Sequence, residues 1–260
     1  MTPEKVVIGD YDEVTIGNCR LIHGDCREML PSIPDDICIV SDPPYGIGYV
    51  HSGGGCGAGL QGTNRIVQGK HTAKSFKIFG DDAPFDPSHL LSYRKVLLWG
   101  ANHYARRLPD GGTWLAWDKS CGRGAADSFA DGEFAWTSEK TKRNVFRHLW
   151  KGIVSEKMGE GVSNPNQFKR FHPSMKPLRL MDWCLEIVGM PDVVCDPYLG
   201  SGSTGVAAAL RGLKFIGIEI DRKYFDIACR RIEQAVAQPR LIPDEKRPDQ
   251  VNESLFEAAL

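Results

Sequence analysis

Residues 37–45 read Ile-Cys-Ile-Val-Ser-Asp-Pro-Pro-Tyr, and the rest of the fold is organised around this stretch. The apolar run at 37–40 predicts a buried strand with Asp42 at its carboxyl end, where open α/β sheets bind their ligands. Pro43 and Pro44 stiffen the backbone and supply no N–H group to satisfy nearby carbonyl oxygens. Asp42, the Pro43 carbonyl and the Tyr45 ring suit a flat ring that carries an amine. Alone, the stretch fits an ordinary proline turn equally well.

Outward from this strand, apolar runs and turn residues alternate in a way that is typical of an α/β fold. Residues 5–25 suggest a hairpin. Further strands are predicted at 20–23, 95–100, 112–118, 134–137, 193–195 and 215–218, and helices at 26–33, 88–93, 102–108, 178–188, 203–211 and 222–237. We expect a mostly parallel, doubly wound, Rossmann-like sheet.

A second stretch, at residues 196–205, reads Asp-Pro-Tyr-Leu-Gly-Ser-Gly-Ser-Thr-Gly and joins a predicted strand to a predicted helix. Its glycines satisfy G-x-G-x-x-G, which lets the backbone approach a ligand closely. Glu219 ends the next strand, where an acidic side chain can accept ribose hydroxyls. This pattern fits a nicotinamide dinucleotide enzyme as well as any other protein that binds an adenosine-type ligand.

The order of the predicted strands along the chain restricts how they can be arranged in the sheet. Only one strand is predicted after Gly205, so the other strands must come from earlier in the chain. The strands at 37–41 and 193–196 can then lie side by side at the topological switch point, with their carboxyl ends in one cleft. Asp25, at the end of a third strand, could reach the adenine of the same ligand.

Composition is that of one globular domain of 260 residues, 42% hydrophobic and 25% charged. No apolar run approaches the roughly 20 residues needed to span a bilayer, and residues 1–5 lack a secretory signal, so we expect a cytoplasmic protein. The eight cysteines form no C-x-x-C pair. They indicate reduced core cysteines and no metal site.

Positive charge is concentrated in two segments, although the net charge is −1. Residues 46–80 carry four bases and no acid, and residues 139–179 carry ten bases against three acids. Such segments can face phosphate, or they can be ordinary solvated loops. The glycine-rich residues 46–63 lie directly after the proposed site and, with the basic stretch that follows, predict a flexible lid or DNA-contacting loop at 46–80. The candidate DNA contacts are Lys70, Lys74, Lys140, Lys142, Arg143, Arg147 and Lys151.

Five motifs in this order resemble those of the amino DNA methyltransferases that use S-adenosylmethionine, in the beta-type arrangement. They are Gly24-Asp25, the Asp-Pro-Pro-Tyr at 42–45, the His-Pro-Ser-Met-Lys-Pro at 172–177, the glycine stretch at 196–204 and the Gly-Ile-Glu-Ile-Asp at 217–221. The resemblance covers about residues 17–235. Tyr198 stands where the family usually has phenylalanine.

The resemblance implies a circularly permuted methyltransferase domain. Residues 1–120 and 172–237 would be its catalytic and cofactor halves, 121–171 a target-recognition region, and 238–260 a tail. Asp42, Pro43, Pro44 and Tyr45 would be catalytic. The implied cofactor contacts are Asp25, Cys26, Asp42, His172, Ser174, Lys176, Asp196, Pro197, Tyr198, Gly200, Ser201, Gly202, Ser203, Thr204, Glu219 and Ile220. Lys176 or Ser174 would bind the cofactor's carboxylate, although segment 172–177 could instead cap the following helix.

The implied reaction is direct methyl transfer to the N6 amine of an adenine turned out of double-stranded DNA. Asp42 and the Pro43 carbonyl would accept both amine hydrogens, localising the nitrogen lone pair. In the family, Asp at the first motif position accompanies adenine more often, which leaves the cytosine N4 amine as the alternative. A DNA-binding module without catalysis and a dehydrogenase are the rival classes. Family resemblance also makes a homodimer plausible.

Overall fold

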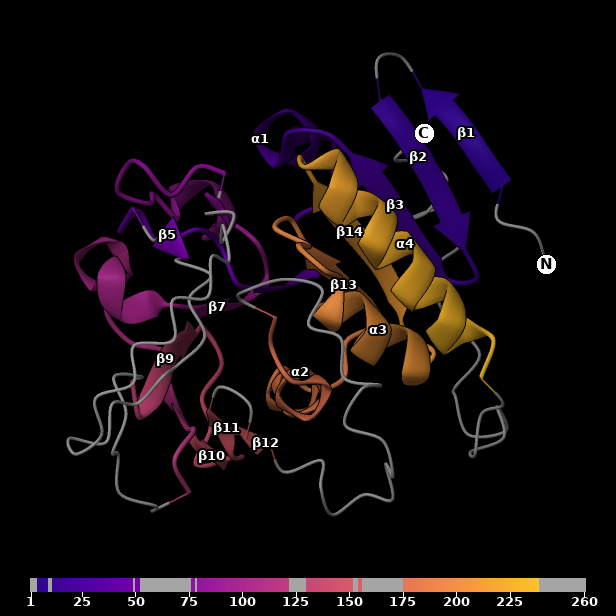
Figure 1. The fold of residues 1–260 in the computed structure, drawn as a ribbon. Coiled ribbons are helices and arrows are strands. Elements are labelled where there is room, and N and C mark those ends of the chain that lie inside the picture. The colour runs from indigo at the N-terminus through magenta and orange to yellow at the C-terminus, as the bar shows by residue number, and fades with distance from the viewer. Residues whose placement is uncertain are drawn as a thin grey trace, which may run out of the picture.

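The computed structural model describes residues 4–8, 11–48, 50–51, 76–77, 79–121, 130–151, 154–155 and 175–238. Ten strands form one sheet in the order β1-β2-β3-β14-β13-β4-β7-β9-β8-β10 (Figure 1). The strands are β1 Glu4–Ile8, β2 Tyr11–Ile16, β3 Cys19–His23, β4 Cys38–Ser41, β7 Lys95–Trp99, β8 Thr113–Asp118, β9 Gly132–Thr137, β10 Val145–Arg147, β13 Val193–Asp196 and β14 Lys214–Glu219. Two small pairs stand apart from this sheet: β5 Val50–His51 with β6 Phe76–Lys77, and β11 Trp150–Lys151 with β12 Val154–Ser155.

The centre of the sheet is parallel, from β3 through β14, β13 and β4 to β7. An antiparallel hairpin, β1 and β2, extends it at one end, and the antiparallel strands β9 and β8 extend it at the other. Every residue of β4 and β13 is buried, as expected for central strands that are covered on both faces. The predicted doubly wound α/β fold is confirmed.

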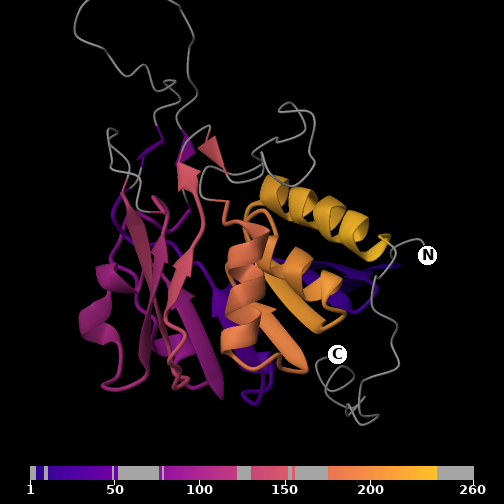
Figure 2. The ribbon, with the colours of Figure 1, turned by 90° about the horizontal axis from the view of Figure 1, so that it is seen from below.

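Three helices, α2 Leu178–Ile187, α3 Ser203–Leu210 and α4 Arg222–Val236, lie side by side over one face of the sheet (Figure 1, Figure 2). Helix α4 begins where the Asp221 carboxylate accepts hydrogen bonds from the backbone N–H groups of Lys223 and Tyr224. Its apolar stripe packs Phe225 and Ile232 into a core shared with α2, α3 and alternate residues of β4 and β13.

The other face of the sheet is covered by the short helix α1 Cys26–Met29 and by 3₁₀ turns. The turns at Ser88–Leu90, Ala101–His103 and Ala105–Arg107 stand where helices were predicted at 88–93 and 102–108. Tyr104, at φ −128° and ψ 27°, interrupts the second stretch and divides it into two turns. The predicted helices are therefore replaced by much shorter elements.

Strands β4 and β13 are neighbours, with Cys195 paired to Ile39. From β13 the chain continues to β14 on one side, and from β4 to β7 on the other, so this is the topological switch point. The predicted adjacency of these strands is confirmed. All cysteines within the described residues are free thiols, and Cys38, Cys184 and Cys195 are buried. None of the described helices combines the length and apolar character needed to cross a membrane.

Candidate active site

The proline turn, residues 42–45, leaves the carboxyl end of β4 as the sequence predicts. The Tyr45 hydroxyl donates a hydrogen bond of 2.5 Å to Oδ1 of Asp42. Burial, followed by the nearby carboxylates of Asp42 and Glu133, raises the pKa of Tyr45, so its hydroxyl keeps its proton. A Cβ atom at Gly100 would lie 2.0 Å from the Tyr45 ring, and His103 stacks on that ring at 5.0 Å between centroids. The turn thus presents an oriented carboxylate beside a fixed aromatic ring.

A buried hydrogen bond joins the ends of β4 and β13. The Ser41 hydroxyl donates to Oδ1 of Asp196 at 2.6 Å, and the Tyr198 backbone N–H donates to the same oxygen at 3.2 Å. Burial raises the pKa of Asp196 to about 6, and these donors oppose the rise. Two stretches that are far apart in the chain therefore meet at one point.

The glycine loop, residues 196–204, connects β13 to α3 and is held from the next strand. The Gly200 backbone N–H donates to Oε2 of Glu219 at 2.7 Å, and the Asp221 N–H donates to Oε1 at 2.8 Å. Burial raises the pKa of Glu219 to about 7 against these donors. Gly202 has φ +80°, and a Cβ atom there would lie 2.9 Å from Cβ of Ala228 on α4. Loop and helices are thus in direct contact.

Ser203 offers a polar atom to this loop. Its Oγ is buried and has no hydrogen-bond partner in the described part of the chain. A Cβ atom at Gly200, at φ +54°, would meet nothing nearer than 4.0 Å, so the space over the loop is open. An orphaned hydroxyl beside an open glycine backbone fits a small polar ligand, because such atoms are normally satisfied in folded proteins.

Asp25 and Cys26 lie beside the glycine loop at the end of β3. The Gly24 N–H donates to the Glu219 carbonyl at 3.0 Å, and the Asp25 carboxylate caps α1 by accepting from the Arg27 N–H at 2.9 Å.

The Tyr198 hydroxyl lies 3.0 Å from Nε2 of His89. Phe85 also packs edge-on against Tyr198. His89 and Phe85 were not predicted, and no local sequence signal marks them.

Lys176 lies at the proline turn, with 7% of its surface exposed. Its ammonium group pairs with Oδ2 of Asp42, lies 3.2 Å from Oε2 of Glu133 and donates to the Tyr45 hydroxyl at 3.2 Å. Burial lowers the pKa of Lys176, but Asp42 and then Glu133 outweigh burial and leave it raised. The sequence predicted Lys176 but not Glu133, which pairs also with Lys119.

Known proteins resemble the chain in sequence and in fold. Residues 116–230 match the family model described as DNA methylase. The matched region holds Glu133, Lys176, the glycine loop and Glu219. The proline turn lies outside it and is brought to it by the pairing of β4 with β13.

Two curated proteins that the chain resembles are named type II methyltransferases. M2.DpnII from Streptococcus pneumoniae is 33% identical over 88 residues, which are 34% of this chain and 30% of the relative. M.HinfI from Haemophilus influenzae is 36% identical over 103 residues, or 39% of this chain and 27% of the relative. The matched stretches thus span less than a third of either relative.

One solved structure, the PvuII DNA methyltransferase described as cytosine-N4-specific, shares the fold of this chain. The two superpose with a TM-score of 0.51 at 14% identity, over 94% of this chain and 92% of the other. At this level of identity the likeness concerns the fold alone.

The basic residues expected to contact DNA lie partly within the described structure. Lys140, Lys142, Arg143 and Arg147 are exposed, between β9 and the end of β10. Arg143 pairs with Glu186 at 3.0 Å and Arg147 lies 3.7 Å from Asp118. The aromatic residues among them pack inward, since Trp150 is buried and Phe146 contacts Trp183 at 5.3 Å between centroids. This segment therefore offers cations to solvent and aromatic rings to the core.

Several predicted site residues lie outside the described residues. They are Lys70, Lys74, His172 and Ser174, together with the side chain of Lys151, most of the 46–80 loop, and the tail from 239 on. The remaining predicted cofactor residues, Pro197, Ser201, Thr204 and Ile220, lie in or directly beside the glycine loop and the end of β14. In the described part of the chain, no group of three or more His, Cys, Asp or Glu residues could hold a metal ion.

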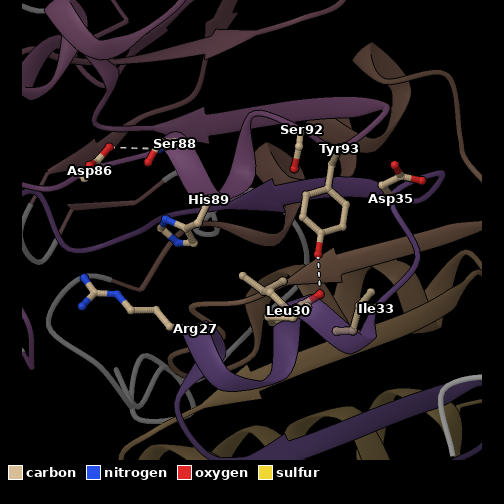
Figure 3. Close-up of a pocket in the computed structure, with 10 residues that line it drawn as sticks. Arg27, Leu30, Ile33, Asp35, Asp86, Ser88, His89, Ser92 and Tyr93 are labelled. Carbon is tan, nitrogen blue, oxygen red and sulfur yellow. Dashed lines mark hydrogen bonds between the residues drawn. The ribbon is translucent and has the colours of Figure 1, made fainter.

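A cavity of about 620 Å³ opens beside α1 (Figure 3), and its wall includes His89, which contacts Tyr198. It is lined by Arg27, Leu30, Pro31, Ile33, Asp35, Asp86, Ser88, His89, Ser92 and Tyr93. The Tyr93 hydroxyl closes one side by donating to the Leu30 carbonyl at 2.9 Å. The cavity adjoins the glycine loop through His89 but includes none of the residues at the proline turn.

Proposed function

We propose that this protein transfers a methyl group from S-adenosylmethionine to the N6 amine of adenine in double-stranded DNA. The observation that carries the proposal is the 2.6 Å hydrogen bond between Ser41 and Asp196, which brings the proline turn and the glycine loop to one point. An amine-accepting turn and a nucleoside-binding loop are the two parts that such a transfer needs. The family match and the named methyltransferase relatives support the same reading.

The glycine loop suits the nucleoside and amino-acid parts of this cofactor. Glu219 and Asp25 end neighbouring strands, so their carboxylates can accept the ribose hydroxyls and the adenine amine. The Ser203 hydroxyl, which has no partner in the described residues, can donate to the cofactor's carboxylate. When bound, S-adenosylmethionine supplies an electrophilic methyl group on its sulfonium.

The proline turn suits the amine that accepts the methyl group. An exocyclic amine on an aromatic ring is a poor nucleophile because its lone pair is delocalised into the ring. Asp42 and the Pro43 carbonyl can each accept one N–H, which favours a tetrahedral nitrogen and localises the lone pair. Tyr45 orients the carboxylate through its 2.5 Å hydrogen bond and offers its ring for stacking.

Adenine is proposed as the target because the motif at 42–45 begins with Asp, which in the resembled family accompanies adenine more often. The target base must leave the duplex to reach the turn, at a cost of a few kcal/mol that stacking partly offsets. The exposed Lys140 and Lys142 are proposed to contact phosphates. A homodimer and a target-recognition role for residues 121–171 remain predictions of the resemblance, and a cytoplasmic location remains a prediction from the sequence.

A transfer assay with identification of the product tests the proposal. The protein is incubated with tritiated S-adenosylmethionine and unmethylated DNA of mixed sequence, and the DNA is then digested to nucleosides. We expect the label in N6-methyldeoxyadenosine. Label in N4-methyldeoxycytidine would move the target to the cytosine amine, and no label in any nucleoside would reject the proposed activity.

A further inference from the structure

Both oxygens of the Asp42 carboxylate already have donors within the protein. Oδ1 accepts the Tyr45 hydroxyl at 2.5 Å, and Oδ2 pairs with the Lys176 ammonium group. A substrate amine that donates to Asp42 therefore competes with these donors for the lone pairs of the carboxylate. The Tyr45 ring is held by Gly100 and His103, whereas Lys176 is a flexible side chain with a second carboxylate within reach.

Glu133 is that second carboxylate. Its Oε2 is itself shielded from solvent and forms an ion pair of 3.2 Å with the Lys176 ammonium group. Its Oε1 pairs with Lys119. Burial raises the pKa of Glu133, but Lys176 and Lys119 outweigh burial and leave it lowered, so the carboxylate stays charged. A charged carboxylate thus already pairs with Lys176 and can hold the ammonium group alone.

We propose that Glu133 is a positioning residue that receives the Lys176 ammonium group when the substrate amine takes its place on Asp42. The inference rests on the proposed function, because it concerns the same reaction. Lys176 moves from one carboxylate to the other without leaving the buried site, so no unpaired charge is created. Lys119 completes a set of two carboxylates and two ammonium groups, and this set stays neutral while the substrate binds.

Without the Glu133 charge, Asp42 becomes the sole carboxylate that balances Lys176. The ammonium group is then held on Asp42 and competes with the substrate amine. Glu133→Gln should lower the single-turnover rate of methyl transfer on the order of 10- to 100-fold, which is a typical cost of misplacing a reacting group. Affinity for S-adenosylmethionine should stay within about 2-fold, since the glycine loop is untouched.

The chain offers a matched control and a conservative variant. Glu139 lies two residues beyond β9 and pairs with Lys95 at 3.6 Å, with side-chain exposure of 31% against 25% for Glu133. Glu139→Gln removes a similar ion pair away from the turn and should keep the rate of the unmodified protein. Glu133→Asp retains the charge on a shorter arm and should recover part of the rate. If Glu133→Gln fails to fold, the comparison of Glu133→Asp with Glu139→Gln decides.

The experiment measures single-turnover transfer to unmethylated DNA for each variant, and cofactor affinity by calorimetry. Equal rates for the Glu133 and Glu139 variants would overturn the inference while leaving the proposed function standing. Loss of cofactor affinity with an unchanged transfer rate would also overturn it, because Lys176 would then serve the cofactor's carboxylate. An inactive unmodified protein would instead reject the proposed function, and this inference with it.

Discussion

The glycine loop and the proline turn lie at the ends of neighbouring strands, but they are held in different ways. The carboxylates that hold the glycine loop, Asp196 and Glu219, accept backbone N–H groups from Tyr198 and Gly200, and Asp196 also accepts the Ser41 hydroxyl. The Asp42 carboxylate is held by two side chains, the Tyr45 hydroxyl and the Lys176 ammonium group. Backbone donors thus define one side of the site, and exchangeable side-chain donors define the other.

This difference separates binding from reaction. Backbone donors form as soon as the loop folds, so the glycine loop is built to hold a ligand in one place. Side-chain ion pairs can be exchanged, so the proline turn is built to release one partner and accept another. Changes at the loop should therefore alter affinity and stability, and changes at the turn should alter the rate of transfer.

The largest effect is expected at the turn. Asp42→Ala removes the acceptor of the substrate amine and should slow methyl transfer on the order of 1,000-fold, while cofactor affinity stays close to that of the unmodified protein. Single-turnover transfer and calorimetry measure the two quantities. Asp36→Ala, at an exposed position before β4, is the control and should retain full activity. A transfer rate retained by Asp42→Ala would contradict the role assigned to this carboxylate.

The next effect concerns the packing of the glycine loop against α4. Gly202 has a φ of +80°, and the Cβ atom added by Gly202→Ala would lie 2.9 Å from Cβ of Ala228. This substitution should therefore lower the free energy of unfolding by about 2–4 kcal/mol. Gly48→Ala has φ +62° with nothing within 4 Å, so only the backbone cost of about 1–2 kcal/mol is expected. Chemical denaturation measures both. Equal losses would show that the contact with α4 contributes nothing.

A smaller effect should appear in the pH dependence of stability. Burial raises the pKa of Glu219 from an ordinary 4.5 to about 7, so between these values the folded protein binds more protons than the unfolded chain. Stability contributed by this group therefore falls as pH rises through that window and is constant above it. Relative to Glu219→Gln, the unmodified protein should lose on the order of 1–3 kcal/mol across the window.

Denaturation curves at several pH values test this expectation. Asp196, whose pKa is also raised, is present in both proteins and so cancels in the difference. If the unfolding free energies of the unmodified protein and Glu219→Gln run parallel from about pH 4.5 to about pH 7, the raised pKa of Glu219 is refuted.

The smallest effect is expected on the exposed surface that follows β9. Replacing the exposed Lys140 and Lys142 by alanine should weaken DNA binding and reduce the slope of log affinity against log salt by about two, roughly one for each phosphate that is no longer neutralised. Arg230→Ala, on the exposed side of α4, serves as the control and should keep the slope. Binding titrations with DNA at several salt concentrations measure this slope. The same slope in both variants would place the DNA elsewhere.

The sequence predicts the glycine loop better than the surroundings of the proline turn, for a physical reason. The strands β4 and β13, their adjacency and the loop with Glu219 follow from apolar runs, glycine spacing and chain order. Glu133 pairs with Lys176 and with Lys119 only because the folded sheet brings these residues together. In the sequence alone, a glutamate within a strand cannot be distinguished from one that simply faces solvent. Lys176 was predicted as a site residue, but for the cofactor's carboxylate.

A crystal structure with S-adenosylmethionine tests most directly whether the proline turn and the glycine loop form one site. We predict that the cofactor lies over Gly200 and Gly202, with its ribose at Glu219 and its sulfonium methyl group directed at Asp42 and the Pro43 carbonyl. A cofactor bound in the cavity beside α1, or over the glycine loop with its methyl group turned away from Asp42, would contradict it.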